Sequence, residues 1–287
     1  MYNRLALIAS DVDGTLVPLG GLLPSQRLVA AVAAARAAGI HFALVTARTF
    51  EQTRPLVQAL SLEGDVAICC GGAQIVRIGA TDRPPENLHQ QAMDPDAVRE
   101  MIVWARARDL RPSVVIEGRY TWQVGDDLPE NMHFGADGWA EVPDIFVAAR
   151  IGVLKFMAHG EPSRLGELLD AAKPLFAGRV NIFRGAPSLI EATALGADKG
   201  AGLRWLLEHL GLESCQTAAL GDGENDESLF AQAGYRIAMG EHAPILRPLA
   251  HRHGQGPSRD GAAKAIEWLT QSVSLPEGLL IEAHFDR

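Results

Sequence analysis

The sequence predicts an α/β protein, in which a doubly wound parallel sheet is interrupted by an inserted α/β domain. Short apolar runs, each of a length that suits one buried strand, alternate with segments of helical periodicity at both ends of the chain. Several of these runs end in polar residues, as expected at the carboxyl edge of an open sheet, where ligands bind. Residues 84–185 lie between the two parts and carry a mixed α/β pattern of their own.

The first strand is expected over the apolar run from Arg4 to Ile8, which is followed closely by Asp11 and Asp13. At the carboxyl end of a strand, both carboxylates would lie in the mouth of the fold. Gly14 permits a sharp turn directly after them. Because Asp, Gly and Thr are also common in ordinary turns, this stretch alone leaves a purely structural interpretation open.

The rest of the first part continues the alternation of helix and strand. Ser25 is the expected N-cap of a helix that runs to residue 38, where Gly39 stands at the stopping position. A strand over 40–45 then delivers Thr46 to the edge that holds the two carboxylates. The remaining elements are a helix over 50–60, interrupted or started near Pro55, a buried strand over 65–70 and a small hairpin arm over 73–78.

The inserted domain is predicted from a change in composition at 79–86, where Thr, Asp, Arg and two prolines form a linker. We therefore expect residues 1–83 and 186–287 to form the core and 84–185 the insertion. Asp94 is the expected N-cap of its first helix, with Pro95 at the first helical position. Its expected elements are helices over 94–108 and 161–176, strands over 113–117, 120–124, 152–158, 179–183 and 188–192, and a polar loop to about residue 143.

The chain returns to the first pattern at Asp198, which opens a helix that runs to about residue 210. Lys199 in the first turn is unfavourable with respect to the helix dipole. That cost suggests that the amine is required there, although a solvated lysine is by itself the more common arrangement.

A third polar strand end follows. The strand 216–220 leads into the loop 221–226, so that Asp222 stands at the same edge as Asp11, with Asn225 and Asp226 close beyond it. The last expected elements are a helix over 227–233, a strand over 235–239, a short helix over 243–249 and a helix over 260–270; the tail from 271 carries no prediction.

The composition excludes several function classes. The chain has 287 residues, of which 47% are hydrophobic and 21% charged, as in a soluble protein of one large or two smaller domains. Its formal net charge of -9 argues against a nucleic-acid surface. The three cysteines are too few for a disulfide scaffold and suit a reducing, cytoplasmic location. Neither a signal peptide nor a membrane-spanning segment is expected, and the sequence makes no prediction of oligomeric state.

Seven polar residues are therefore expected at one edge of the sheet: Asp11, Asp13, Thr46, Lys199, Asp222, Asn225 and Asp226. The four carboxylates would repel one another unless a cation were present. Mg²⁺ suits Asp11 and Asp222 with the backbone carbonyl of Asp13, since this ion keeps waters and substrate phosphate among its ligands. Thr46 and Lys199 would then hold the oxygens of a phosphoryl group during its transfer.

Either Asp11 or Asp13 could take up the phosphoryl group, because a carboxylate can act as a covalent acceptor. The other would protonate the leaving alcohol and then activate water. The spacing alone leaves both assignments open.

In their order along the chain, four motifs resemble those of the haloacid dehalogenase (HAD) superfamily phosphatases: Asp11-Val-Asp13-Gly-Thr15, Thr46, Lys199-Gly200 and Gly221-Asp222-Gly-Glu-Asn225-Asp226. More narrowly they are similar to the Cof-like branch, in which an α/β cap of type IIB is inserted between the second and third motifs. Three shorter stretches match that branch as well: Ser188-Leu-Ile-Glu191, Ala238-Met-Gly240 and Asp260-Gly261.

The resemblance implies a Rossmann-like core, Mg²⁺, and hydrolysis of a small phosphorylated metabolite such as a sugar phosphate. It assigns Asp11 as the nucleophile that forms an aspartyl-phosphate and Asp13 as the general acid and base. Asn225 is expected to join the phosphate-binding groups, and Asp226 to lie beside the metal ligands. Arg48 is a candidate for a contact with the substrate or the cap, although a solvated arginine is at least as common.

The sequence departs from the family where Gly72 and Glu241 stand in place of a common Asn. In the family, both positions lie near the substrate rather than among the groups that carry the reaction. Phosphatases of the mannosyl-phosphoglycerate or sucrose-phosphate type share the same class of cap. The inserted domain is expected to choose the substrate. Its candidates for contacts with the leaving group are Arg119, Tyr120, Trp122, His133, Lys155 and Arg184.

Other functions use similar groups. A phosphotransferase or mutase would share the core and differ only in the exclusion of water. A phosphometabolite-binding protein without activity would be expected to have lost a core group, and none is missing here. A receiver-type signalling domain also combines acids, Thr and Lys, but it is only about half as long as this chain.

Overall fold

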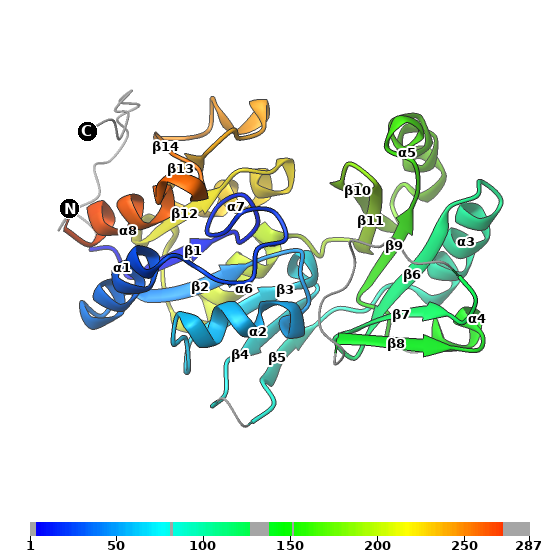
Figure 1. Cartoon of the computed structure of the whole chain (residues 1–287), viewed down its shortest axis with the longest axis horizontal. Helices are drawn as coiled ribbons and strands as arrows, with labels where there is room; N and C mark the ends of the chain where they lie inside the picture. The colour runs from blue at the N-terminus through cyan, green and yellow to red at the C-terminus, as the bar shows by residue number, and fades with distance from the viewer. Residues whose placement is uncertain (1–3, 81–82, 127–137, 151, 272–287) are drawn as a thin grey trace. The chain divides into compact units, whose positions relative to one another are not determined.

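The computed structural model describes residues 4–80, 83–126, 138–150 and 152–271 (Figure 1). The chain forms two compact units. The first comprises Met1–Thr46, Thr53–Leu88 and Asp198–Arg287, and the second comprises Ala47–Gln52 and His89–Ala197. Both contain helices and a β-sheet, so the predicted α/β class is confirmed.

The first unit is built on an eight-stranded sheet with the order β14-β13-β12-β1-β2-β3-β4-β5. The six strands from β14 to β3 are parallel, whereas β4 runs antiparallel to β3. The expected hairpin arm is therefore part of the main sheet. The strands are β1 (Leu7–Ser10), β2 (His41–Val45), β3 (Val66–Cys69), β4 (Gln74–Arg77), β5 (Glu86–Gln90), β12 (Thr217–Gly221), β13 (Tyr235–Met239) and β14 (Arg252–Gly254).

Helices cover both faces of this sheet, because alternate side chains of its buried strands point to opposite sides. On one face Leu7, Ala43 and Ala219 pack with Leu203 of α6 and Phe230 of α7. Helices α1 and α8 pack against each other on the other side (Figure 1). The helices are α1 (Gln26–Ala37), α2 (Phe50–Ala59), α6 (Lys199–Leu210), α7 (Glu227–Gln232) and α8 (Gly261–Gln271), and 3₁₀ turns span Cys70–Gly72, Ser214–Gln216, Glu224–Asp226, Pro244–Leu246 and Pro257–Arg259.

Some boundaries differ from the prediction. The first strand begins three residues later than expected because it pairs with β12 and β2 in a register that starts at Leu7. Helix α2 continues through Pro55, at the loss of one backbone hydrogen bond. The expected helix over 243–249 is only a 3₁₀ turn, and the edge strand β14 was not predicted because three residues carry too short a pattern.

The second unit contains a six-stranded sheet with the order β10-β11-β9-β6-β7-β8. The strands pair antiparallel except β7 with β8. Asp94 caps its first helix as predicted, by accepting hydrogen bonds from two backbone amides. The elements are β6 (Arg111–Ile116), β7 (Arg119–Gln123), β8 (Trp139–Val142), β9 (Lys155–His159), β10 (Val180–Ala186), β11 (Leu189–Ala194), α3 (Pro95–Arg106), α4 (Ile145–Ala148) and α5 (Pro162–Phe176), of which β8 and α4 were not predicted.

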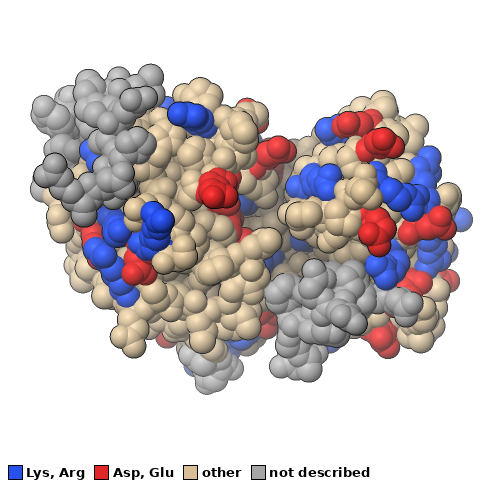
Figure 2. Space-filling view, turned by 45° about the horizontal axis from the view of Figure 1, so that its top comes forward, with Lys and Arg blue, Asp and Glu red and all other residues tan. Residues whose placement is uncertain are grey.

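Charged side chains of both signs are interspersed on the face shown in Figure 2. Several form ion pairs with near neighbours, such as Arg27 with Glu267 and Arg179 with Glu100, each at 2.6 Å. Exposed pairs of this kind contribute little to stability and mainly keep opposite charges together on the surface. Within the described part of the chain, no helix is both long enough and apolar enough to cross a membrane.

Two glycines with left-handed backbone conformations allow a test of the packing behind the sheet edge. Gly72 has a φ of 103°, and a Cβ there would lie 2.0 Å from the carbonyl oxygen of Asp198; Gly64 has a φ of 87° and open space around it. We expect Gly64→Ala to lower the free energy of unfolding by about 1 to 2 kcal/mol through backbone strain alone. Gly72→Ala should lower it by at least about 3 kcal/mol, because a backbone atom must also move. Urea unfolding of the two variants checks this, and equal losses would contradict the close approach of Asp198.

Candidate active site

The site lies where three neighbouring parallel strands end. Ser10 of β1 is in register with Leu220 of β12 on one side and Leu44 of β2 on the other. The residues that follow these strands therefore emerge at one edge. Asp11, Thr46 and Asp222 are placed there as the sequence predicted.

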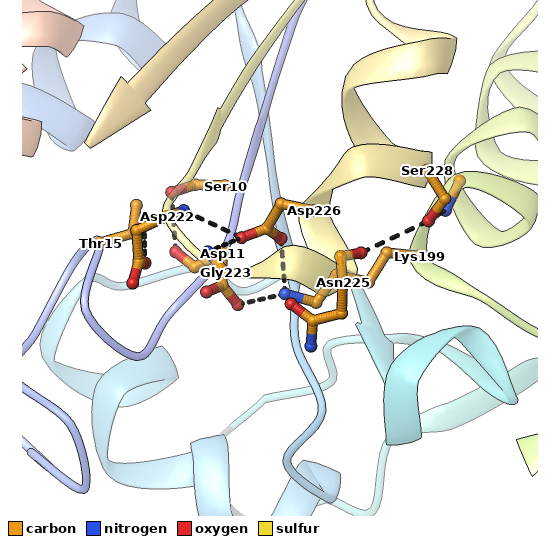
Figure 3. Close-up of polar contacts among 10 residues, drawn as sticks. Ser10, Asp11, Thr15, Lys199, Asp222, Gly223, Asn225, Asp226 and Ser228 are labelled. Atoms are coloured by element: carbon orange, nitrogen blue, oxygen red, sulfur yellow. Dashed lines mark hydrogen bonds and ion pairs between the residues drawn. The ribbon is translucent and has the colours of Figure 1, made fainter. Parts of the chain in front are cut away.

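Lys199 lies at the centre of the site (Figure 3). Its ammonium nitrogen is 2.8 Å from Oδ1 of Asp11 and 2.6 Å from Oδ1 of Asp226. The side chain is only 2% exposed, so the solvated alternative for this lysine is wrong. Burial by itself lowers the pKa of Lys199, but the two carboxylates outweigh it and raise the pKa above its ordinary value.

The first turn of α6 is held in place independently of this ion pair. The side chain of Asp198 caps the helix by accepting a hydrogen bond from the amide of Ala201 at 2.7 Å. The amide of Gly200 donates to Oγ of Ser228 in α7 at 3.1 Å. A Cβ at Gly200 would lie 2.2 Å from the carbonyl oxygen of Ser228, so only glycine permits this approach of the two helices.

Asp226 is fully buried and uses both carboxylate oxygens within the protein. Oδ1 accepts from Lys199, and Oδ2 accepts from the backbone amides of Asp222 and Gly223, each at 2.9 Å. It thereby fixes the backbone of Asp222 at the end of β12. Both carboxylate oxygens of Asp226 are thus held by the protein next to the other acids.

Asp222 is held by the turn that follows β1. Oγ1 of Thr15 donates a hydrogen bond to Oδ1 of Asp222 at 2.6 Å. Gly14 has a φ of 80°, and a Cβ there would lie 2.2 Å from Oδ2 of the same carboxylate. Thr15 was not predicted to have a role of its own, although its place directly after the turn glycine was the available signal.

The cluster of Asp11, Asp222 and Asp226 is suited to a cation. Each of the three offers one carboxylate oxygen, and these atoms lie within 4.8 Å of one another. Lys199 contributes one positive charge beside these three carboxylates, so the cluster has an excess of negative charge when all three are ionised. Burial, followed by the charge of Asp226, raises the pKa of Asp11 well above its ordinary value, with Lys199 opposing. Burial likewise raises the pKa of Asp222 to about 6, against the hydrogen bond from Thr15. A metal ion bound at this cluster would lower the pKa values of both Asp11 and Asp222.

The other predicted residues lie as follows. Oδ1 of Asp13 accepts a hydrogen bond from the amide of Gly20 at 2.8 Å, and its carboxylate is not part of the acidic cluster. Thr46 is fully buried at the end of β2, where its carbonyl accepts from the amide of Gly71 at 2.9 Å. The carbonyl of Asn225 accepts from Oγ of Ser228. Arg48 is buried in the short segment Ala47–Gln52 of the second unit, so a solvated position is wrong for it.

The candidates for contacts with the leaving group differ in their surroundings. Lys155 is buried, and Arg184 donates to the backbone carbonyls of Pro162, Ala186 and Pro187. The indole of Trp122 donates to Glu141 at 3.2 Å, whereas Arg119 is exposed. His133 lies outside the described residues.

The sequence matches the haloacid dehalogenase-like hydrolases over residues 8–266. The chain belongs to this family. The predicted resemblance to its Cof-like phosphatases is confirmed, and the chain is an enzyme, a phosphatase of the HAD type.

Individual proteins are similar to this chain in sequence or in fold. An "HMP-PP phosphatase" from Enterobacter sp. (strain 638) is 27% identical over 274 residues, which cover 92% of this chain and 96% of that protein. A haloacid dehalogenase-like hydrolase from Bacteroides thetaiotaomicron shares the fold, with a TM-score of 0.81, 24% identity and coverage of 93% of this chain and 100% of the other. A HAD subclass IIB sugar phosphatase is similar in fold at a TM-score of 0.75 and 21% identity, over 92% of this chain and 98% of its own.

The raised pKa of Asp222 predicts how metal binding depends on pH. A ligand must be deprotonated, so protons compete with the metal as the pH falls through about 6, and affinity should drop about tenfold per pH unit below that point. Thr15→Val removes a hydrogen bond that lowers this pKa, so it should move the midpoint to higher pH by about one unit. Calorimetric titration with Mg²⁺ between pH 5 and 8 measures both. An affinity that does not change with pH would contradict the role of Asp222 as a ligand.

Proposed function

We propose that the protein is a Mg²⁺-dependent phosphatase that hydrolyses a small phosphorylated metabolite through an aspartyl-phosphate on Asp11. The observation that carries the proposal is the position of Lys199, buried between Asp11 and Asp226 at a strand edge. An ammonium held there without water can stabilise negative charge that develops on a transferring phosphoryl group. The free cysteines at positions 69, 70 and 215 support a reducing, cytoplasmic setting for the reaction.

Asp11, Asp222 and the backbone carbonyl of Asp13 would hold the metal ion, with Asp226 beside them. One oxygen of Asp11 is paired with Lys199, which leaves the other for the metal or for attack on phosphorus. When bound, Mg²⁺ would neutralise charge on the phosphate oxygens and keep Asp11 and Asp222 ionised. The excess of negative charge in the cluster supports this assignment.

In the first half of the reaction, a carboxylate oxygen of Asp11 attacks phosphorus and the bond between phosphorus and the leaving oxygen breaks. Asp13 donates its proton to that leaving oxygen. The amide of Gly20 holds the Asp13 carboxylate, which fixes its orientation for this transfer.

In the second half, Asp13 takes a proton from water, and the resulting hydroxide attacks the phosphorus of the aspartyl-phosphate. The bond to Asp11 breaks, which releases inorganic phosphate and restores the carboxylate. Thr46, Lys199, Asn225 and Arg48 are proposed to bind the phosphoryl oxygens throughout. Positioning and electrostatic stabilisation of this kind account for most of the catalysis of phosphoryl transfer.

The substrate is proposed to be a compact phosphate ester or diphosphate. HMP-PP and sugar phosphates should come first in a panel of test substrates. One relative is named an HMP-PP phosphatase, and one structural neighbour is named a sugar phosphatase. The panel should also contain p-nitrophenyl phosphate, whose leaving group makes few demands on binding.

Phosphate release from this panel tests the reaction class. We expect release that requires Mg²⁺ and stops with chelator, and a loss of at least about 10³-fold in kcat for Asp11→Asn, because the amide is a poor nucleophile. Full turnover by Asp11→Asn, or in chelator, would refute the proposal. Formation of a phosphorylated isomer without phosphate release would show a mutase instead.

Asp13→Asn separates the two halves of the reaction. Without an acid and base, kcat should fall by about 10²- to 10⁴-fold, and less for p-nitrophenyl phosphate, whose leaving group needs no proton. Because hydrolysis of the intermediate still needs the base, phosphoprotein should accumulate with that substrate. Intact-protein mass spectrometry after acid quenching detects it, and Asp11→Asn/Asp13→Asn is the control that should show none.

A further inference from the structure

Two of the groups that are proposed to bind the phosphoryl oxygens come from different segments of the first unit. Lys199 begins α6, and Asn225 lies in the 3₁₀ turn Glu224–Asp226 that leads into α7. Both can contact one phosphoryl group only if their separation is fixed, because a group that is held even about 1 Å out of place loses much of its effect. The contacts between the two segments therefore decide whether the two groups can act together.

Ser228, in the first turn of α7, links these segments in addition to the ion pair of Lys199 with Asp226 (Figure 3). The amide of Gly200 donates to Oγ of Ser228 at 3.1 Å, and the carbonyl oxygen of Asn225 lies 3.4 Å from the same Oγ. A hydroxyl has two acceptor lone pairs and one hydrogen. Since Gly200 uses a lone pair, the hydrogen is donated to Asn225, and one oxygen atom joins both segments.

This hydroxyl completes the first turn of α6. The first amides of an α-helix have no acceptor within the helix itself. The side chain of Asp198 accepts from the amide of Ala201, and Ser228 accepts from the preceding amide, that of Gly200. Without the hydroxyl, a partly buried donor of α6 would lose the partner that it has in the loop side of the site.

Close contact of the two backbones fixes the place of the hydroxyl. A Cβ at Gly200 would lie 2.2 Å from the carbonyl oxygen of Ser228 and 3.0 Å from its Cβ. The short side chain of serine therefore reaches the amide of Gly200 directly. The geometry of the link is set by packed backbone on both sides rather than by a long and flexible side chain.

We infer that Ser228 is a positioning residue, which fixes Asn225 relative to Lys199 so that both contact the same phosphoryl group. Lys199 has two ion pairs of its own, with Asp11 and Asp226, so it is Asn225 whose position depends on the hydroxyl. Ser228 acts through Asn225 and is not itself a catalytic residue. The inference rests on the proposed phosphatase function, in which Asn225 and Lys199 bind the phosphoryl oxygens.

Ser228→Ala removes the hydroxyl and tests this role. We expect the Kd for inorganic phosphate, measured by calorimetric titration in the presence of Mg²⁺, to rise by about 3- to 10-fold, which corresponds to the net effect of one hydrogen bond. The value of kcat/KM for p-nitrophenyl phosphate should fall by a similar factor, because the same contacts hold the phosphoryl group during the reaction.

A double-mutant cycle shows whether the effect passes through Asn225. Asn225→Ala removes the side chain that Ser228 is inferred to position. In that background, Ser228→Ala should have no further effect on the Kd for inorganic phosphate, so the two changes should be strongly non-additive. A general loosening of α7 would instead weaken phosphate binding in both backgrounds.

Ser214→Ala is the matched control. Oγ of Ser214 donates to the carbonyl of Gln232 at 2.8 Å, so this change removes a hydrogen bond between a hydroxyl and the backbone at the opposite end of the same helix. It should leave the Kd for phosphate and kcat/KM within about twofold of the wild type. Thermal unfolding of every variant shows that each is folded at the assay temperature.

The outcomes separate the inference from the function on which it rests. A loss of phosphate affinity in Ser228→Ala that is absent from Ser214→Ala and from the Asn225→Ala background supports the inference. No loss, an equal loss in the two serine variants, or a loss that persists without the Asn225 side chain would overturn it while the phosphatase stands. A wild type that hydrolyses no substrate of the panel with Mg²⁺ would instead refute the proposed function.

Discussion

The contact between Lys199 and two carboxylates is the interaction on which the site depends. Removal of an ammonium from water is unfavourable, and at this depth only ion pairs with good geometry offset it. Asp11 and Asp226 supply them at 2.8 and 2.6 Å. Because the three residues come from the end of β1, the start of α6 and the loop after β12, a single buried charge links three distant parts of the sequence.

Backbone amides and the hydroxyl of Thr15 complete the arrangement. Amides of Asp222 and Gly223 bind Asp226, and the turn after β1 holds Asp222 through Thr15. Asp226 and Asp222 are therefore oriented by groups in tight turns of the chain, and the electrostatic environment is preorganised before any substrate binds. The same rigidity keeps like charges close together, which adds to the effect of burial in raising the pKa values of Asp11 and Asp222.

Much of this could be predicted from the sequence because the signals are local. Ser25 and Asp94 cap their helices as expected, a helix opens at Asp198, and the parallel strands bring Asp11, Thr46 and Asp222 to one edge. The short edge strand β14 and the strand β8 were missed, since a few residues at the margin of a sheet carry no periodic pattern.

The contacts made by side chains could be predicted less well than their approximate positions. Lys199 was placed at the right edge, but whether it was solvated depended on acids 188 and 27 positions away in the chain. The residues around Glu191 in the sequence do not predict that one of its oxygens is buried with no hydrogen-bond partner among the described residues, because that depends on the register of β9, β10 and β11. Such features follow from tertiary packing, which no short window of sequence describes.

The close approach of backbone to carboxylate at two glycines has a consequence for the comparison of natural variants. A Cβ at Gly14 would strike Asp222, and one at Gly221 would lie 2.5 Å from the carboxylate carbon of Asp226. A related gene can therefore keep every acid and the lysine and still encode an inactive protein if either glycine has changed. Surveys that score only the charged residues would count such copies as working enzymes.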